Sequence, residues 1–513
     1  MSLRRLPVAG LMLMLLPAAV FGASTDTLAT AADRGDQALV RSLLKQGADV
    51  NAPGVDGSTA LHRAVHADRL DVASLLLKAG AKVTVADRYG VTPLSLACLN
   101  GNAQMIRLLI EVGADPNAVD STGETPLMIA ARTGVPEALG ALVDAGARVD
   151  ARDRTFQQNA LMFAVRENHP AAVKFLVEHG ASVNAQTRKG PTPAFVPPCK
   201  GTGCGSEGVG INRGGLPDRG RRAETKGGMT PLLYAARDGR IEPARLLLAA
   251  GADIEQADAN GIHPLLIAVL NSHLEIARLL IEYGADVNAD DFWGRSPLWA
   301  AVEYRNLDMN NKDQDSPTDN FVDRAPLLAF TQELLDAGAN VNARTREVPP
   351  MRRWLYALGD VSWVDFTGQT PFLRAALSGD TAAMRLLLRY GADPNLPTLA
   401  GTTPLMAAAG VNWVVQQTYT ESPQAVLDAV KMCLDLGADT NATNSMGLTA
   451  LLGAANRGSN DIIEFLASKG ARLDVKDREG RTALRWAEGV FLAAVGAERK
   501  PKTIALLERL NAR

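Results

Sequence analysis

The sequence is poor in aromatic residues and in cysteine. Of 513 residues, only 5% are Phe, Trp or Tyr, and four are Cys. A chain with few rings fills its core with Ala and Leu, which favours closely packed helices. Hydrophobic residues make up 47% and charged residues 21% of the chain, a composition that excludes a disordered protein. The length exceeds one ordinary core and indicates several domains or one long array.

The chain also lacks an excess of positive charge. Its formal net charge is −3 at pH 7, whereas a nucleic-acid-binding surface must be densely basic to neutralise phosphates. We therefore expect no nucleic-acid partner. Beyond the first residues, no segment is long and apolar enough to span a bilayer, so we expect no integral membrane segment in the mature chain.

The first residues differ from the rest. Arg4 and Arg5 precede an apolar run over residues 11–21, and small residues follow it. This is the layout of a secretory signal peptide. The alternative is a membrane anchor, but the run is too short to span a bilayer comfortably. We predict a signal peptide over residues 1–23, cleaved near Ala23, and a periplasmic or secreted protein.

Motifs for catalysis and for metal binding are missing too. No Cys-x-x-Cys-His, no His-Glu-x-x-His and no Ser–His–Asp or paired-carboxylate arrangement stands out. His62 and His66 are four residues apart, but no acidic residue accompanies them at metal-binding spacing. Residues 203–208 match G-x-G-x-x-G with neither a strand before nor a helix after, which argues against a dinucleotide site. We expect no enzyme activity, no cofactor and no metal.

The sequence does contain a repeat, seen most clearly in a tripeptide of the type Thr-Pro-Leu. The tripeptide begins at positions 59, 92, 125, 159, 230, 263, 296, 370, 403, 449 and 482. Most steps between these positions are 33 residues, and the long steps are 33 residues plus an insertion. A fixed period of this length is typical of a repeat protein.

The repeat that begins at Thr230 shows how one unit is built. Thr230 can cap a helix with its hydroxyl, and Pro231 suits the first helical position, where no N–H is needed. Gly239 ends this short helix. A second helix begins near Glu242 and ends at Gly251, which adopts a left-handed conformation at little cost. Each unit is therefore predicted to be helix, tight turn, helix and protruding loop.

These residues resemble the ankyrin repeat family, whose unit has about 33 residues and begins T-P-L-H-x-A. The stretch from Thr59 to Ala64, TALHRA, is close to that signature. The resemblance implies an all-α solenoid of about twelve helix-turn-helix units, in which His62 ties its loop by hydrogen bonds. It also implies protein binding on the concave face formed by first helices and loops. We predict repeats over residues 24–190, 228–345 and 369–513, with polar terminal caps.

Four insertions interrupt the predicted array. A Gly/Pro-rich insertion covers residues 191–227, and a Trp/Arg-rich insertion covers residues 346–368; both extend protruding loops. Two more separate the helices of a pair, one near 305–325 and one between 403 and 437. The first insertion holds six Lys or Arg against three Asp or Glu. We expect the loop insertions to be the individual part of this protein.

The cysteines fall into two kinds. Cys98 and Cys433 lie in predicted helices about ten units apart and cannot meet, because each unit of a solenoid contacts only its neighbours. We expect both to be buried. Cys199 and Cys204 lie in the first insertion and are predicted to form a disulfide if the protein is exported.

Five of the six tryptophans lie between positions 293 and 413. Because Trp and Arg most often anchor interfaces, we predict a partner-binding site here. Its residues are Trp293, Trp299, Arg352, Arg353, Trp354, Tyr356, Trp363 and Trp413. The alternative is that these rings pack the insertion onto the array.

The function favoured by the sequence is that of a non-catalytic protein–protein interaction scaffold, exported and monomeric, similar to exported bacterial ankyrin repeat proteins. Two alternatives remain open. One is an enzyme or small-anion site built by the long loops, where the Gly-rich residues 209–215 could bind an anion through backbone N–H groups. The other is a secreted effector that acts on a host protein.

Overall fold

The structure is a computed structural model that describes residues 27–191, 225–306, 324–347, 367–413, 421–490 and 498–512. Over these residues it contains 24 helices, α1–α24, and no strand. The chain divides into two compact units, residues 1–148 and 149–513, which we call unit 1 and unit 2.

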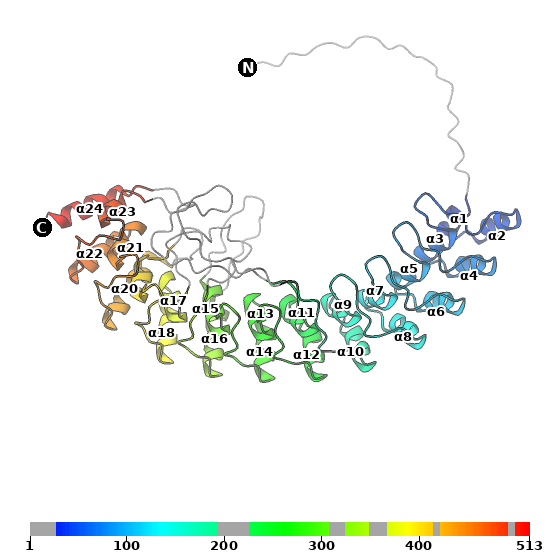
Figure 1. The fold of residues 1–513 in the computed structure, drawn as a ribbon, viewed down its shortest axis with the longest axis horizontal. Helices are drawn as coiled ribbons and strands as arrows, with labels where there is room; N and C mark the ends of the chain where they lie inside the picture. The colour runs from blue at the N-terminus through cyan, green and yellow to red at the C-terminus, as the bar shows by residue number, and fades with distance from the viewer. Residues whose placement is uncertain are drawn as a thin grey trace, which may run out of the picture. The chain divides into compact units, whose positions relative to one another are not determined.

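Unit 1 contains four helix pairs within its described residues. They are α1 (Leu28–Arg34) and α2 (Gln37–Lys45), α3 (Ala60–His66) and α4 (Leu70–Lys78), α5 (Pro93–Asn100) and α6 (Ala103–Glu111), and α7 (Pro126–Thr133) and α8 (Pro136–Asp144). Odd-numbered helices pack side by side in one layer and even-numbered helices in a second (Figure 1). The first repeat, which lacks the Thr-Pro-Leu type of start, is therefore a complete helix pair, α1 and α2.

Unit 2 repeats the arrangement with eight pairs in its described part. They are α9 (Ala160–Arg166) and α10 (Pro170–Glu178), α11 (Pro231–Asp238) and α12 (Ile241–Ala249), α13 (Pro264–Leu270) and α14 (Leu274–Glu282), α15 (Pro297–Arg305) and α16 (Arg324–Asp336), α17 (Pro371–Ser378) and α18 (Thr381–Arg389), α19 (Pro404–Ala409) and α20 (Pro423–Asp435), α21 (Ala450–Arg457) and α22 (Asn460–Ser468), and α23 (Ala483–Ala487) and α24 (Pro501–Asn511). The predicted all-α repeat fold with about twelve helix pairs is confirmed.

The pair α11–α12 forms for the reasons seen in its sequence. The Thr230 hydroxyl accepts a hydrogen bond from the backbone N–H of Leu233 at 3.1 Å, and Pro231 is the first helical residue. Gly239 ends α11 at φ 72°, and a Cβ atom there would lie 2.8 Å from the ring of His273. Only glycine fits this combination of backbone angle and close approach.

The core consists of the small and branched side chains that the composition predicted. In α11 and α12, Leu232, Ala235, Ala236 and Leu247 are fully buried. Burying one leucine contributes about 1.5–3 kcal/mol, and the alanines let neighbouring helices approach closely. The stability of each pair therefore depends on its neighbours, which cover the apolar faces it cannot cover alone.

The last pair differs from the regular unit expected there. The interval between α23 and α24 is 13 residues long, whereas two residues separate α11 from α12. No further repeat start follows position 482, so the spacing in the sequence could not show this longer connection. In this predicted polar cap, Glu498 and Arg499 are exposed and Lys500 is half-buried.

Cys98 in α5 and Cys433 in α20 are buried free thiols, as predicted. Burial raises the pKa of the Cys433 thiol to about 12 and that of Cys98 above its ordinary value as well. Both behave as small apolar residues of the core. Cys199 and Cys204 lie outside the described residues.

Candidate partner-binding surface

Several protruding loops are fixed by an aspartate that precedes the helix pair, and the loops at Thr398 and Asn444 are fixed in the same way by those side chains. In unit 1, Asp87 Oδ1 accepts the backbone N–H groups of Tyr89 at 2.8 Å and of Val91 at 2.9 Å. In unit 2, Asp291 makes the same contacts with the N–H groups of Trp293 and Arg295. Such a turn fixes the backbone at the loop tip, so the side chain at the tip is displayed without further ordering.

Several of these tips carry large apolar side chains that face solvent. In unit 1 they are Val55, 92% exposed, and Tyr89, 70% exposed; in unit 2 they are Phe156, 61% exposed, Phe292 and Leu399. We call these five residues the tip residues. Apolar groups on a rigid loop lose little conformational entropy when a partner covers them, which makes them candidates for contact.

His62 ties its loop to the next repeat, as the resemblance implied. The Thr59 N–H donates to His62 Nδ1 at 3.1 Å, and Nε2 lies 3.2 Å from the Val91 carbonyl oxygen. A backbone N–H can only donate and a carbonyl can only accept, so the ring is neutral with its proton on Nε2. Burial lowers the pKa of His62 below its ordinary value, although the contact with Val91 opposes the shift.

We expect His62→Ala to lower the stability of unit 1 by about 1–3 kcal/mol, because a buried N–H and a carbonyl each lose a partner. The native protein should also lose stability as pH falls below 6.5. The pKa of His62 is lowered in the folded state, so the unfolded chain binds more protons at this residue in that range. Thermal unfolding at about pH 7.5 and about pH 5.5 would measure both effects. An equal loss on acidification in both proteins would contradict this role.

A row of asparagines joins successive repeats and was missed in the sequence. Asn51 donates from Nδ2 to the Gly80 carbonyl at 3.1 Å and accepts the Lys82 N–H at 2.8 Å. The same pair of bonds recurs at Asn117 in unit 1 and at Asn184, Asn288, Asn342 and Asn441 in unit 2. The available signal was an Asn four residues after the Gly that ends a second helix, a spacing shared by all six of these asparagines.

Two of the predicted contact residues are buried. Trp293 has no exposed surface and Trp299 is 2% exposed. Arg295, paired with Asp291 at 2.6 Å, lies over the Trp293 ring at 5.2 Å. Neither ring offers a surface to a partner, and both are buried within the repeats. Trp299 occupies the place that His62 has in its own repeat, three residues after the cap.

Trp413 is half-buried and packs against Leu373, Leu377 and Ala407. The Arg457 guanidinium lies 5.2 Å from the centre of its ring, and burial lowers the pKa of Arg457 to about 10. Trp413 therefore contributes to packing between repeats and keeps part of its surface open. The other predicted contact residues, Arg352, Arg353, Trp354, Tyr356 and Trp363, lie outside the described residues.

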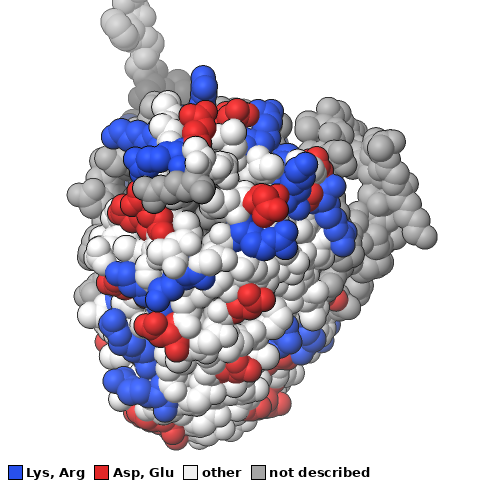
Figure 2. Space-filling model, turned by 90° about the vertical axis from the view of Figure 1, so that its left-hand side faces the viewer, with Lys and Arg blue, Asp and Glu red and all other residues white. Residues whose placement is uncertain are grey.

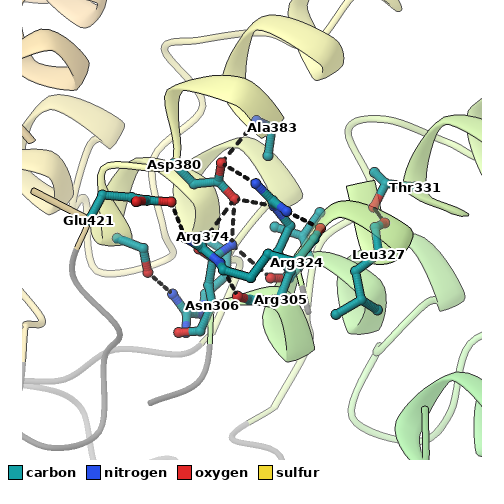
Figure 3. Close-up of polar contacts among 11 residues, drawn as sticks. Arg305, Asn306, Arg324, Leu327, Thr331, Arg374, Asp380, Ala383 and Glu421 are labelled. Carbon is teal, nitrogen blue, oxygen red and sulfur yellow. Dashed lines mark hydrogen bonds and ion pairs between the residues drawn. The ribbon is translucent and has the colours of Figure 1, made fainter. Parts of the chain in front are cut away.

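A buried network of charges lies at the end of α15 and the start of α16, on either side of the insertion between them (Figure 3). Arg305, at the end of α15, makes a two-point contact with Asp380, with Nε–Oδ2 at 2.7 Å and Nη2–Oδ1 at 3.2 Å. Arg324, at the start of α16, lies 3.5 Å from Asp380 and also pairs with Glu421. The three residues Arg305, Arg324 and Asp380 thus join α15, α16 and α18.

A second pair extends the network to α17. Arg374 pairs with Glu303 and donates to the Asn306 carbonyl at 2.8 Å and to Ser378 Oγ at 2.9 Å. Asn306 in turn accepts from Arg324 Nη2 at 2.8 Å. The network therefore holds Asn306 and Arg324, the two residues that border 307–323, beside one another.

The charges in this network balance. Burial acts to raise the pKa of the Asp380 carboxyl, but hydrogen bonds and charge from Arg305, the Ala383 N–H and the charge of Arg324 together hold it below its usual value. Asp380 is therefore an anion at neutral pH, and its side chain is only 1% exposed. Such a group is stable only while its arginines remain in place.

We also searched the described residues for metal sites, membrane-spanning helices and regions of one charge. No group of three or more His, Cys, Asp or Glu that could hold a metal occurs there, and no helix is long and apolar enough to cross a membrane. Figure 2 shows the face at the C-terminal end of the chain, where positive and negative side chains are interspersed around an uncharged area. This face has no large region of one sign.

Models of known protein families match the repeats of this chain. A family model described as "Ankyrin repeats (3 copies)" matches residues 28–120, 96–187, 232–311 and 422–490, and a model described as "Ankyrin repeat" matches residues 367–396. Together these ranges cover more than half of the chain.

Individual relatives match smaller parts. The mouse and human proteins named ankyrin repeat domain-containing protein 63 are each 35% identical over 128 residues, 23% of this chain and 30% of theirs. Ankyrin repeat and KH domain-containing protein mask-1 of Caenorhabditis elegans is 29% identical over 123 residues, 24% of this chain and 4% of that protein. The chain thus spans less than a third of the length of these relatives. Among solved structures, the human ASB11 ankyrin repeat domain is similar with 24% identity, a TM-score of 0.39, and coverage of 50% of this chain and 98% of that domain.

Proposed function

This chain belongs to the ankyrin repeat family, and we propose that it is a non-catalytic scaffold that binds a protein partner through its loops and first helices. Ankyrin repeats are in general protein–protein interaction modules. The observation that carries the proposal is the set of tip residues, large apolar side chains displayed on loops whose backbone is fixed by an aspartate or, beside Leu399, by Thr398. Scattered apolar side chains on a surface need no explanation, but the tip residues recur in the same loop of the repeat, three or four positions before the repeat start.

The Trp/Arg-rich insertion is proposed as a second contact region. Its residues Arg352, Arg353, Trp354, Tyr356 and Trp363 have the side chains that most often anchor interfaces. The network around Asp380 supports a role in binding for the neighbouring part of unit 2. It holds the two ends of the insertion between α15 and α16 through buried contacts, which leaves the exposed surface free for a partner. We also propose that the protein is exported, on the basis of its signal-like first residues. We further propose that it acts as a monomer.

Replacing four tip residues should remove the partner. We expect Val55→Ser, Tyr89→Ser, Phe292→Ser and Leu399→Ser together to lower partner recovery about tenfold or more, because exposed anchors carry much of the binding energy of an interface. The measurement is affinity capture of the tagged protein from its own cell envelope, quantified by mass spectrometry. A parallel variant, Trp354→Ala with Trp363→Ala, tests the insertion separately.

The matched control replaces exposed apolar residues at the ends of second helices, away from the tips. Val112, Tyr283 and Leu436 are 48%, 46% and 37% exposed, and their replacement by Ser should leave recovery unchanged. Equal recovery with the native, tip and insertion variants, all folded by circular dichroism, would refute protein binding by these surfaces.

A further inference from the structure

The loops at the beginning of unit 2 carry basic side chains that form no ion pair with any described residue. Arg154, Arg188, Lys189 and Lys226 are all exposed. Phe156, one of the tip residues, lies among them and is 61% exposed. We call these five residues the basic patch. It is a local excess of positive charge on a chain whose formal net charge is −3.

Backbone contacts bring the three segments of the basic patch together. The Arg188 N–H donates to the Phe156 carbonyl at 2.8 Å, and Arg188 Nη2 donates to the Arg154 carbonyl at 3.0 Å. The Gly190 N–H donates to the Lys226 carbonyl at 2.7 Å. Residues 154–156, 188–190 and 226 therefore lie side by side, although they come from distant parts of the sequence.

Two acidic side chains beside these segments, among the residues that the structure describes, are committed to other contacts. Asp153 is 3% exposed, and its carboxylate accepts the backbone N–H groups of Phe156 at 2.6 Å and of Gln158 at 2.9 Å. Asp258 accepts the N–H groups of Asn260 and Ile262. Both carboxylates hold turns, so neither neutralises the basic patch at the surface.

The positive charge continues onto the first helices. Arg166 of α9 lies 5.5 Å from the centre of the Tyr234 ring, and Arg237 of α11 lies 4.8 Å from it. Arg237 pairs with Asp238 at 2.7 Å, whereas Arg166 forms no ion pair with a described residue. A guanidinium held against a ring is already oriented for a carboxylate, and this orientation lowers the entropy cost of contact.

We propose that the basic patch binds an acidic segment of the protein partner, with Phe156 in contact with an apolar side chain of that segment. The inference rests on the proposed function and adds the chemical class of the partner. Charge complementarity favours this occupant, because a few positive groups beside one exposed ring match a short acidic stretch. A nucleic acid needs many phosphates neutralised in a row and several rings for stacking.

The experiment uses the purified full chain and a short fluorescein-labelled peptide of alternating glutamate and leucine. Fluorescence anisotropy gives the dissociation constant at low and at physiological ionic strength. The test variant is Arg154→Gln, Lys189→Gln and Lys226→Gln, which leaves the side-chain bond of Arg188 intact. We expect its dissociation constant to rise about tenfold, and the salt dependence of binding to weaken.

The matched control is Lys174→Gln, Arg245→Gln and Arg385→Gln, which removes equal charge from exposed positions on α10, α12 and α18. It should bind the peptide as the native chain does. The proposal is overturned if the test variant binds equally well, if the control loses as much affinity, or if the native chain does not bind the peptide. Tighter binding of an oligothymidylate or of phosphatidylglycerol vesicles would also overturn it. Partner capture that depends on the other four tip residues, together with unchanged peptide binding, would leave the proposed function standing and remove this inference alone.

Discussion

Replacing Asp380 by Ala is expected to destabilise the middle of unit 2 by about 3–5 kcal/mol, because it leaves buried arginines without their carboxylate. Arg305 would lose both of its contacts to the carboxylate, and Arg324 would lose one of its two acidic partners while keeping Glu421 and its hydrogen bond to Asn306. The cost exceeds that of a surface ion pair because the Arg305 and Asp380 side chains are only 7% and 1% exposed. Hydrogen-exchange mass spectrometry of α15–α18 measures the opening free energy directly.

Glu464→Ala provides the comparison, since it breaks the exposed pair with Arg509, which lies 3.0 Å away. Its effect should stay below about 1 kcal/mol. Acid should reproduce part of the Asp380→Ala effect. The pKa of Asp380 is lowered in the folded protein, so its contribution is present above the ordinary value of 3.8 and is lost as pH falls through the folded-state value. If Asp380→Ala lowered the opening free energy from hydrogen exchange by no more than Glu464→Ala does, the network would contribute little to stability.

Trp486→Ala should open the last helix pair, with an expected cost of about 3–5 kcal/mol. Trp486 is 1% exposed in α23, and its Nε1 donates to Asp477 Oδ2 at 3.0 Å. Arg481 lies over the same ring at 4.6 Å. Removing the ring leaves a large cavity in a pair that packs against α21 and α22. Loss of amide protection in α23 and α24 measures the effect.

Trp486→Phe separates the ring from its hydrogen bond. Phenylalanine fills most of the volume but cannot donate to Asp477, so we expect a cost of roughly 1 kcal/mol. Protection in α9–α12 should not change in either variant, because a repeat contacts only its neighbours. Equal loss across unit 2 would mean that the pairs unfold together and would contradict this expectation.

The helix pairs could be predicted from the sequence because their determinants are local. Thr230, Pro231 and Gly239 lie within ten positions of one another, and each has a backbone requirement that hardly depends on the rest of the chain. The regular period then extended this assignment along the chain. The longer connection in the last pair escaped because it needed a following repeat as a reference.

The environment of the rings and charges could not be predicted in the same way. Trp299 follows its cap by three residues, a position that the sequence alone leaves open to either surface or core. The pairing of Arg305 with Asp380 joins residues 75 positions apart across two insertions. Such contacts depend on the spacing between repeats in space, which no local pattern records. The asparagine row could have been found, since its spacing from glycine is constant.

That asparagine row separates distance in space from distance along the chain. Asn51 reaches the next repeat across 29 positions of sequence, whereas Asn184 makes the same contact across 67. The bonds that these asparagines accept from the next repeat are 2.7–2.9 Å long whatever the length of chain between the partners. We therefore expect that each long loop can change in length, or be replaced by a foreign sequence, without a change in the spacing between repeats. The loop sequences can then diversify while the helical framework stays the same.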